Sequence, residues 1–207
     1  MSEKKNIMEY ETVALDEENL AVVIIDQTKL PGRTEIISLK TAQEIWDAIY
    51  LLQVRGAPAI GVAAAFGIYV LAEGMEETDY DSFLKEFQKQ KEYLDSARPT
   101  AVNLSWALNR MEQVVLEHRT SSVAEIKALL KKEAKEIKEE DVWVCKTIGE
   151  YGLTLVKPGD GILTHCNAGQ LATSKYGTAT APSIWDRKRA TTSMFLRMRQ
   201  DRFAGAR

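Results

Sequence analysis

The sequence predicts an α/β protein in which an N-terminal hairpin and helical domain is followed by the start of an incomplete Rossmann-like domain. Two β-branched apolar segments lie before residue 40, five segments with helical spacing lie between residues 41 and 156, and a short apolar segment at 161–166 leads into a glycine-containing loop. A strand, such a loop and a helix are how Rossmann-like domains begin. We therefore expect residues 1–150 to form the first domain, 151–182 to begin the second, and 183–207 to be a separate tail.

The first predicted element is a β-hairpin. Leu20 to Asp26 reads LAVVIID and Thr34 to Leu39 reads TEIISL, with a turn at Pro31-Gly32 between them. Two segments rich in β-branched residues that are separated by a turn favour antiparallel pairing. The hairpin is therefore predicted over residues 20–39.

Five helices follow the hairpin. Thr41 and Glu44 have the spacing of a capping box, which starts a helix that ends near residue 52, and Pro58 suits the first turn of a second helix that runs to about Ala72. The other three helices are predicted over residues 80–94, 101–118 and 122–156. Gly149 or Gly152 is an alternative end for the last of them.

The segment after the long helix predicts a change of architecture. Residues 157–160 read as a turn and Gly161 to Cys166 as a short buried strand. A loop at 167–169 then leads into a helix start predicted at 171–179.

Composition excludes several classes of protein. Of the 207 residues 45% are hydrophobic and 28% charged, which is typical of a globular chain, and the net charge of −3 gives no general attraction to nucleic acid. No apolar run is long enough to cross a membrane, and the N-terminus lacks the apolar core of a signal peptide. We expect a cytoplasmic protein whose two cysteines, Cys145 and Cys166, are free thiols.

Two arginines precede predicted helix starts and are candidate anion ligands. Arg55, Gly56 and Ala57 lead into the second helix, where unpaired N–H groups and an adjacent guanidinium can bind phosphate. Arg98 stands before the helix predicted at 101–118 and is a candidate second ligand. The alternative, which spacing alone favours, is a glycine turn with two solvated arginines.

Cys166 is the candidate reactive group because it ends a predicted strand beside a glycine loop. Ligands of open α/β sheets bind beyond the carboxyl ends of strands, and a thiol placed there can act as acid, base or nucleophile. The alternative is a small buried hydrophobic residue. His165 would point to the opposite face of the strand, so no Cys-His pair is predicted, and the two histidines of the chain form no dense metal cluster.

Three motifs together resemble the methylthioribose-1-phosphate isomerase family of methionine salvage. They are VRGAPAIGVAAAFG at 54–67, SARPTAVNLSWAL at 96–108, and ILTHCNAG with the LAT and YGTA that follow it, over 162–179. The resemblance runs from about residue 8 to Pro182. This family shares its fold with the regulatory subunits of the guanine-nucleotide exchange factor of translation initiation and with ribose-1,5-bisphosphate isomerases.

The resemblance implies an aldose–ketose isomerase that converts 5-methylthioribose 1-phosphate to 5-methylthioribulose 1-phosphate. It implies no metal or redox cofactor, no nucleic-acid or membrane partner, and a homodimer for the intact protein. It places substrate binding at Arg55, Gly56, Ala57 and Arg98 and makes Cys166 the catalytic cysteine. The alternatives left open are a non-catalytic regulatory subunit and a ribose-1,5-bisphosphate isomerase.

Residues 183–207 depart from the family pattern. They hold six arginines and one lysine against two aspartates, and the chain lacks the catalytic aspartate and the Asn-Lys pair that family members carry further on. The segment 183–203 can be back-translated so that a shifted frame reads YMGQKAGYDFHVFADETRPL, which is the continuation expected of the family. We therefore expect a truncated chain with a frame-shifted tail whose fold is poorly specified, and no isomerase activity. A genuine RNA-binding arm is the alternative interpretation of this basic tail.

Overall fold

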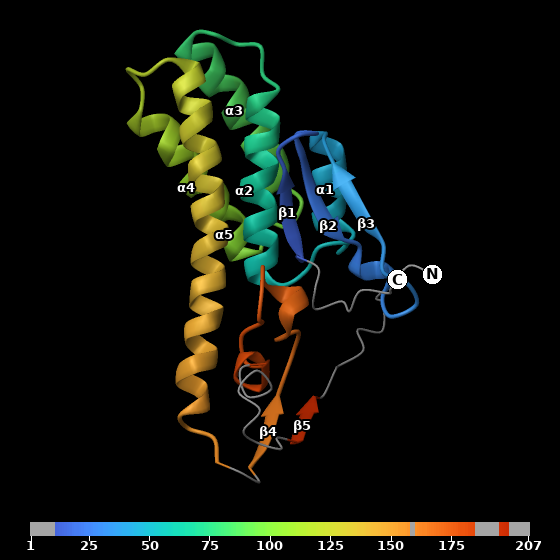
Figure 1. Ribbon diagram of the computed structural model, residues 1–207. Helices are drawn as coiled ribbons and strands as arrows, with labels where there is room; N and C mark the ends of the chain where they lie inside the picture. The colour runs from blue at the N-terminus through green and yellow to red at the C-terminus, as the bar shows by residue number, and fades with distance from the viewer. Residues whose placement is uncertain (1–10, 158–159, 185–194, 199–207) are drawn as a thin grey trace.

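The computed structural model describes residues 11–157, 160–184 and 195–198 (Figure 1). Its strands are β1 (Val13–Asp16), β2 (Ala21–Ile25), β3 (Ile36–Leu39), β4 (Gly161–Thr164) and β5 (Phe195–Met198). Its α-helices are α1 (Ala42–Tyr50), α2 (Ala57–Glu73), α3 (Tyr80–Asp95), α4 (Val102–Glu117) and α5 (Val123–Leu153). Two 3₁₀ helices lie at Gln27–Lys29 and Gln170–Ala172.

The N-terminal sheet is antiparallel with the strand order β1-β2-β3. The β2–β3 pairing sets Val23 opposite Ser38, which confirms the hairpin predicted over residues 20–39. Its connection is longer than the predicted Pro-Gly turn, because Asp26 caps the 3₁₀ helix at Gln27–Lys29 by accepting a hydrogen bond from the N–H of Thr28. Strand β1 was not predicted, since four residues with one acid carry too little periodicity.

The predicted capping box and the predicted helix starts are present. The N–H of Glu44 donates to the hydroxyl of Thr41 at 3.2 Å, and the Glu44 carboxylate accepts from the N–H of Thr41 at 2.9 Å. Ser122 and Glu125 form the same arrangement at the start of α5. All five predicted helices are confirmed, with boundaries within about three residues of those predicted.

Helix α2 is the centre of the core and lies between the N-terminal sheet and the other long helices (Figure 1). Its residues from Ala59 to Val70 are all buried, because the helix has neighbours on every side. Its small residues allow close approach: a Cβ on Gly61 would lie 3.1 Å from the carbonyl oxygen of Asn103 in α4. None of the helices that the structure describes is long and apolar enough to cross a membrane.

Helix α5 passes through Gly149, so that alternative end is wrong, and it ends at Leu153, one residue beyond the alternative end at Gly152. Gly152 serves another purpose, since a Cβ there would lie 2.6 Å from the ring Cγ of Pro182. The long helix extends past the other helices toward β4 and β5, as Figure 1 shows. Its C-terminal half thereby becomes a support for the segment that follows β4.

The C-terminal part departs from three predictions. Strand β4 ends at Thr164 rather than Cys166, and it is mostly exposed: Leu163 retains 77% of its accessible surface and only Thr164 is buried. The helix predicted at 171–179 is instead a 3₁₀ helix followed by turns, and helical residues resume at 181–184. The hydroxyl of Thr173 bonds backbone groups of Gln170, Lys175 and Gly177, which competes with helix hydrogen bonding.

The tail predicted at 183–207 is described only at residues 183–184 and in β5; the rest of it lies outside the described residues. Strand β5 pairs in parallel with β4, with Gly161 opposite Phe195 and Thr164 opposite Met198. This differs from the expectation of a poorly specified tail. The edge of β4 offers unpaired backbone groups that an extended segment can satisfy.

Candidate functional site

The N-terminal end of α2 presents backbone N–H groups that no side chain caps. Gly56 is the N-cap residue with φ of 100° and ψ of 133°, a conformation that favours glycine, and Pro58 lies in the first turn. The first-turn N–H groups point out of the helix and form the positive end of its dipole. Because the rest of α2 is buried, this field is weakly screened, and the helix end is suited to binding an anion.

The two candidate arginines lie in the segments that precede α2 and α4. Arg55 is half-buried immediately before Gly56, and Arg98 is half-buried in the loop between α3 and α4. The contact of Gly61 with the carbonyl oxygen of Asn103 places the first turn of α4 beside α2. Within the described ranges neither guanidinium forms an ion pair with a carboxylate, so both cations are available to a ligand.

The loop that follows Cys166 closes on the start of α2. A Cβ on Gly56 would lie 2.4 Å from the Cα of Ala172 and 2.7 Å from its carbonyl oxygen, so only glycine fits. This contact joins the motif at 54–67 to the motif at 162–179. The sequence motifs that were predicted separately therefore meet at one end of one helix.

Two long-range hydrogen bonds hold the same loop to the N-terminal part of the chain. The hydroxyl of Thr12, which is fully buried, donates to the carbonyl oxygen of Gln170 at 3.0 Å. The side-chain amide of Gln27 donates to the carbonyl oxygen of Leu171 at 2.7 Å. Neither residue was a candidate from the sequence, because no local pattern marks a partner more than a hundred positions away.

Cys166 lies two residues beyond β4 and is exposed, so the alternative of a buried hydrophobic residue is wrong. Its φ of 67° is in the left-handed region, which ends the strand and is costly for a residue with a Cβ. The loop beyond it is closed by the carbonyl oxygen of Ala168, which accepts from the N–H of Thr178 at 2.9 Å and from the hydroxyl of Thr180 at 3.0 Å. The exposed thiol thus lies at the start of a loop that these hydrogen bonds close.

Cys145 has the opposite character. It lies inside α5 with 1% of its surface exposed, and burial together with the nearby Asp141 carboxylate raises the pKa of its thiol to about 12. A thiol with this pKa is almost entirely protonated at neutral pH and unreactive. Of the two cysteines, only Cys166 is available for chemistry.

A cavity of about 210 Å³ opens beside the start of α2. Its lining comes from α2, α4 and α5 and consists of Pro58, Val62, Asn103, Trp106, Ile137, Glu140, Asp141 and Val144. No cationic side chain lines it, although Arg110 lies behind it, 5.5 Å over the Trp106 ring and bonded to Glu140. Apolar walls with two carboxylates favour an uncharged group over an anion.

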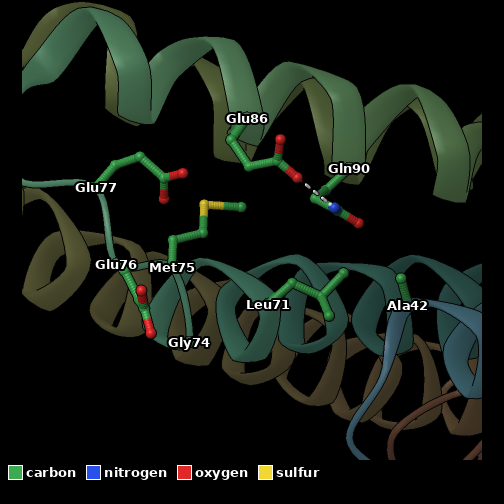
Figure 2. Close-up of a pocket in the computed structure, with 8 residues that line it drawn as sticks. All are labelled: Ala42, Leu71, Gly74, Met75, Glu76, Glu77, Glu86 and Gln90. Atoms are coloured by element: carbon green, nitrogen blue, oxygen red, sulfur yellow. Dashed lines mark hydrogen bonds between the residues drawn. The ribbon is translucent and has the colours of Figure 1, made fainter.

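A larger cavity of about 430 Å³ lies at the opposite end of α2, beside Met75 (Figure 2). Three glutamates line it, and Figure 2 shows Glu77 and Glu86 on the side of the cavity that the Met75 side chain faces. Hydrogen bonds from Gln90 and Lys89 lower the pKa of Glu86. This cavity is anionic, stands at the negative end of the helix dipole, and is unsuited to a phosphate.

No group of three or more potential metal ligands occurs among the described histidines, cysteines and acids. The arrangement at the start of α2 can hold an anion with main-chain N–H groups and two guanidinium groups. An exposed thiol lies in the loop that contacts this helix end.

Comparison with known proteins agrees with the motifs. The model of the "Initiation factor 2 subunit family" matches residues 53–191. A methylthioribose-1-phosphate isomerase of Symbiobacterium thermophilum is 57% identical over 172 residues, which are 83% of this chain and 48% of that protein. A 5-deoxyribose 1-phosphate isomerase of Clostridium botulinum is 54% identical over 167 residues, 81% of this chain and 48% of that protein. The chain spans about half the length of the curated relatives it matches.

Two solved structures share the fold. The 5-methylthioribose 1-phosphate isomerase of Pyrococcus horikoshii superposes with a TM-score of 0.83 at 35% identity, covering 91% of this chain and 60% of that one. The translation initiation factor eIF-2B subunit delta of A. fulgidus superposes with a TM-score of 0.81 at 37% identity, covering 92% and 54%. An enzyme and an initiation factor are therefore almost equally similar in backbone.

Proposed function

The chain belongs to the Initiation factor 2 subunit family, and we propose that it is the sugar-phosphate-binding half of an aldose–ketose isomerase. The observation that carries this proposal is the contact of Gly56 with Ala172. It joins the anion-binding end of α2 to the loop that bears the exposed thiol of Cys166.

The proposed roles follow from the chemistry of each group. The N–H groups after Gly56, including that of Ala57, together with the guanidinium groups of Arg55 and Arg98, bind the phosphate. Cys166 faces the carbon skeleton and takes part in proton movement. In the reaction the carbon–hydrogen bond at C2 breaks and one forms at C1, so the substrate is rearranged without external oxidant or reductant, and no cofactor is needed.

The smaller cavity, beside the start of α2, supports a substrate that carries no charge at C5. The two relatives described above are named for methylthioribose 1-phosphate and 5-deoxyribose 1-phosphate, which carry a methylthio group and a hydrogen at that position. The carboxylates of Glu140 and Asp141 would repel the second phosphate of ribose 1,5-bisphosphate. We therefore favour 5-methylthioribose 1-phosphate over the bisphosphate.

The region after residue 150 is proposed to be the start of a Rossmann-like domain. The parallel pairing of β4 with β5 supports this, since parallel strands are how such a sheet begins. In the back-translated frame, the codons of Phe195 to Met198 read Val-Phe-Ala-Asp, so β5 coincides with a strand-like segment of the expected continuation. We propose that residues 183–203 are a frame-shifted reading, which the nucleotide sequence of the gene tests directly.

Isomerase activity should be absent from the chain as written, because the later catalytic aspartate is missing from it. We further propose a cytoplasmic location and a homodimer for the intact enzyme. A coupled assay on purified 1–207 is expected to show no turnover. Turnover near that of a full-length relative would contradict both the frame-shift and the role given to the missing aspartate.

Ligand binding tests the site without requiring turnover. Saturating 5-methylthioribose 1-phosphate should slow alkylation of Cys166 in the full chain, whereas ribose 1,5-bisphosphate should slow it less. Mass spectrometry after iodoacetamide treatment measures the rate, with buried Cys145 as the internal control. Equal rates with and without the sugar phosphate, together with no binding of inorganic phosphate in calorimetry, would favour the alternative of a non-catalytic regulatory protein.

A further inference from the structure

We propose that Asp141 is a positioning residue that holds the loop of Cys166, defined here as residues 165–180, against α5. This rests on the proposed function, because it assigns to Asp141 the placement of the thiol used there. Asp141 lies in the middle of the long helix and belongs to none of the three sequence motifs.

Each oxygen of the Asp141 carboxylate accepts a hydrogen bond. Its Oδ2 atom accepts a hydrogen bond from the backbone N–H of Ser174 at 2.6 Å, and its Oδ1 atom accepts from the thiol of Cys145 at 3.6 Å. Within the described part of the chain no cation pairs with this carboxylate. A charged acceptor on a main-chain N–H is stronger than a neutral one, so this bond is a substantial link between helix and loop.

Ser174 shows how far the loop depends on that link. It retains 2% of its surface, and its hydroxyl has no hydrogen-bond partner among the residues that the structure describes. The hydrogen bond from the backbone N–H of Ser174 to the Asp141 carboxylate therefore holds this buried residue to the helix. Leaving that N–H unpaired should shift the equilibrium toward the open loop by about five- to a hundredfold.

The link reaches Cys166 through a short, closed path. The hydroxyl of Thr173 donates to the carbonyl oxygen of Lys175 and accepts from the N–H of Gly177, which holds the turn around Ser174. The hydroxyl of Thr180 donates to the carbonyl oxygen of Ala168, which lies two residues after Cys166. Cys166 itself is in the left-handed region, which surrounding contacts must maintain. Releasing Ser174 should let the loop relax and change the exposure and direction of the thiol.

The test compares two substitutions of similar volume in the full chain. Asp141→Leu removes the acceptor without opening a cavity, and Asp141→Asn keeps an oxygen that can accept from Ser174. Glu139→Ala, an exposed acid two residues earlier on α5, is the matched control. The measurements are hydrogen exchange of the Ser174 amide, alkylation of Cys166, and urea unfolding for global stability.

Asp141→Leu is expected to raise Ser174 exchange by about tenfold and to change the Cys166 alkylation rate several-fold, while inorganic phosphate still binds. In the absence of ligand, Asp141→Asn should keep the Ser174 exchange rate and the Cys166 alkylation rate of the original chain, as should Glu139→Ala. Should Asp141→Leu fail to fold, Asp141→Ala and the degree of rescue by Asp141→Asn provide the same comparison.

The outcomes separate this inference from the proposed function. Ser174 exchange and Cys166 alkylation that are unchanged in Asp141→Leu would overturn the positioning role, whatever ligands bind. A changed thiol in that variant, combined with no protection by 5-methylthioribose 1-phosphate in the original chain, would support the positioning role and count against the isomerase site. A uniform fall in unfolding free energy and phosphate binding would also overturn the proposal, because it would mark Asp141 as generally structural.

Discussion

The two ends of α2 differ in charge, in contacts and in cavity size. The N-terminal end has first-turn N–H groups that no described side chain caps, with Arg55 beside them and the Cys166 loop packed on Gly56. The C-terminal end has a cavity about twice as large, but three glutamates line it and the helix dipole there is negative. Cavity volume is therefore a poor guide to the proposed phosphate site; the sign of the local field and the convergence of distant segments favour the N-terminal end of α2.

The two ends also use glycine differently. Gly56 has a positive φ and no room for a Cβ, whereas Gly74 has φ of −77° and an added Cβ there would lie 3.5 Å from the carbonyl oxygen of Leu71. One glycine is required by a contact between distant segments, and the other is an ordinary helix end. The difference predicts unequal costs of the same substitution.

The largest effect is expected for Gly56→Ala. The added methyl group would overlap Ala172 and strain the backbone, so the free energy of unfolding should fall by about 2–4 kcal/mol. Gly74→Ala at the other end should change it by less than about 1 kcal/mol. Urea unfolding measures both, and equal costs at the two ends would refute the close packing of the loop on α2.

The next largest effect is expected for Arg55→Ala in binding of inorganic phosphate. Loss of a charged hydrogen-bond donor should weaken binding by about tenfold or more, and the loss should shrink as salt is added. Glu77→Gln at the opposite end should change the dissociation constant by less than about twofold. Isothermal titration calorimetry measures the dissociation constants of both variants. A larger effect of the Glu77 substitution would place phosphate in the cavity at the C-terminal end of α2 and contradict the proposal.

The smallest effect concerns the acidic end and its pH dependence. The pKa of Glu86 is lowered from 4.5, first by the hydrogen bond from Gln90, so the stabilisation is present above pH 4.5 and is lost as pH falls through the depressed pKa. Glu86→Gln should therefore lower the melting temperature slightly at pH 7 and leave it unchanged at strongly acidic pH. In a Gln90→Ala background the same substitution should have less effect, and an equal effect in both backgrounds would contradict the assigned cause.

The helices and their starts were predictable because their signals are local. Thr41 with Glu44 and Pro58 before an apolar run mark helix ends within a few residues of sequence, and the structure confirms both. The helix expected at 171–179 failed for a related reason. The segment is rich in serine and threonine, and the hydroxyl of Thr173 bonds backbone groups that a helix would need.

The candidate site was predictable only in part. Motif identity drew attention to Arg55, Arg98 and Cys166, but the burial expected of the strand before Cys166 was wrong, since the exposed Leu163 shows how little covers it. Asp141 and Thr12 were not predicted at all. Each acts through a main-chain group of the loop, and a contact with a backbone atom leaves no characteristic residue type at the other end.

Amphipathic spacing and capping residues were sufficient to specify five helices and a hairpin, because each depends on interactions within a few residues along the chain. Which of those pieces touch, and hence whether a thiol and a phosphate site share one location, depended on packing between segments more than a hundred residues apart. The contact of Gly56 with Ala172 is of this second kind, since it requires the whole core around α2 to bring two distant backbones together.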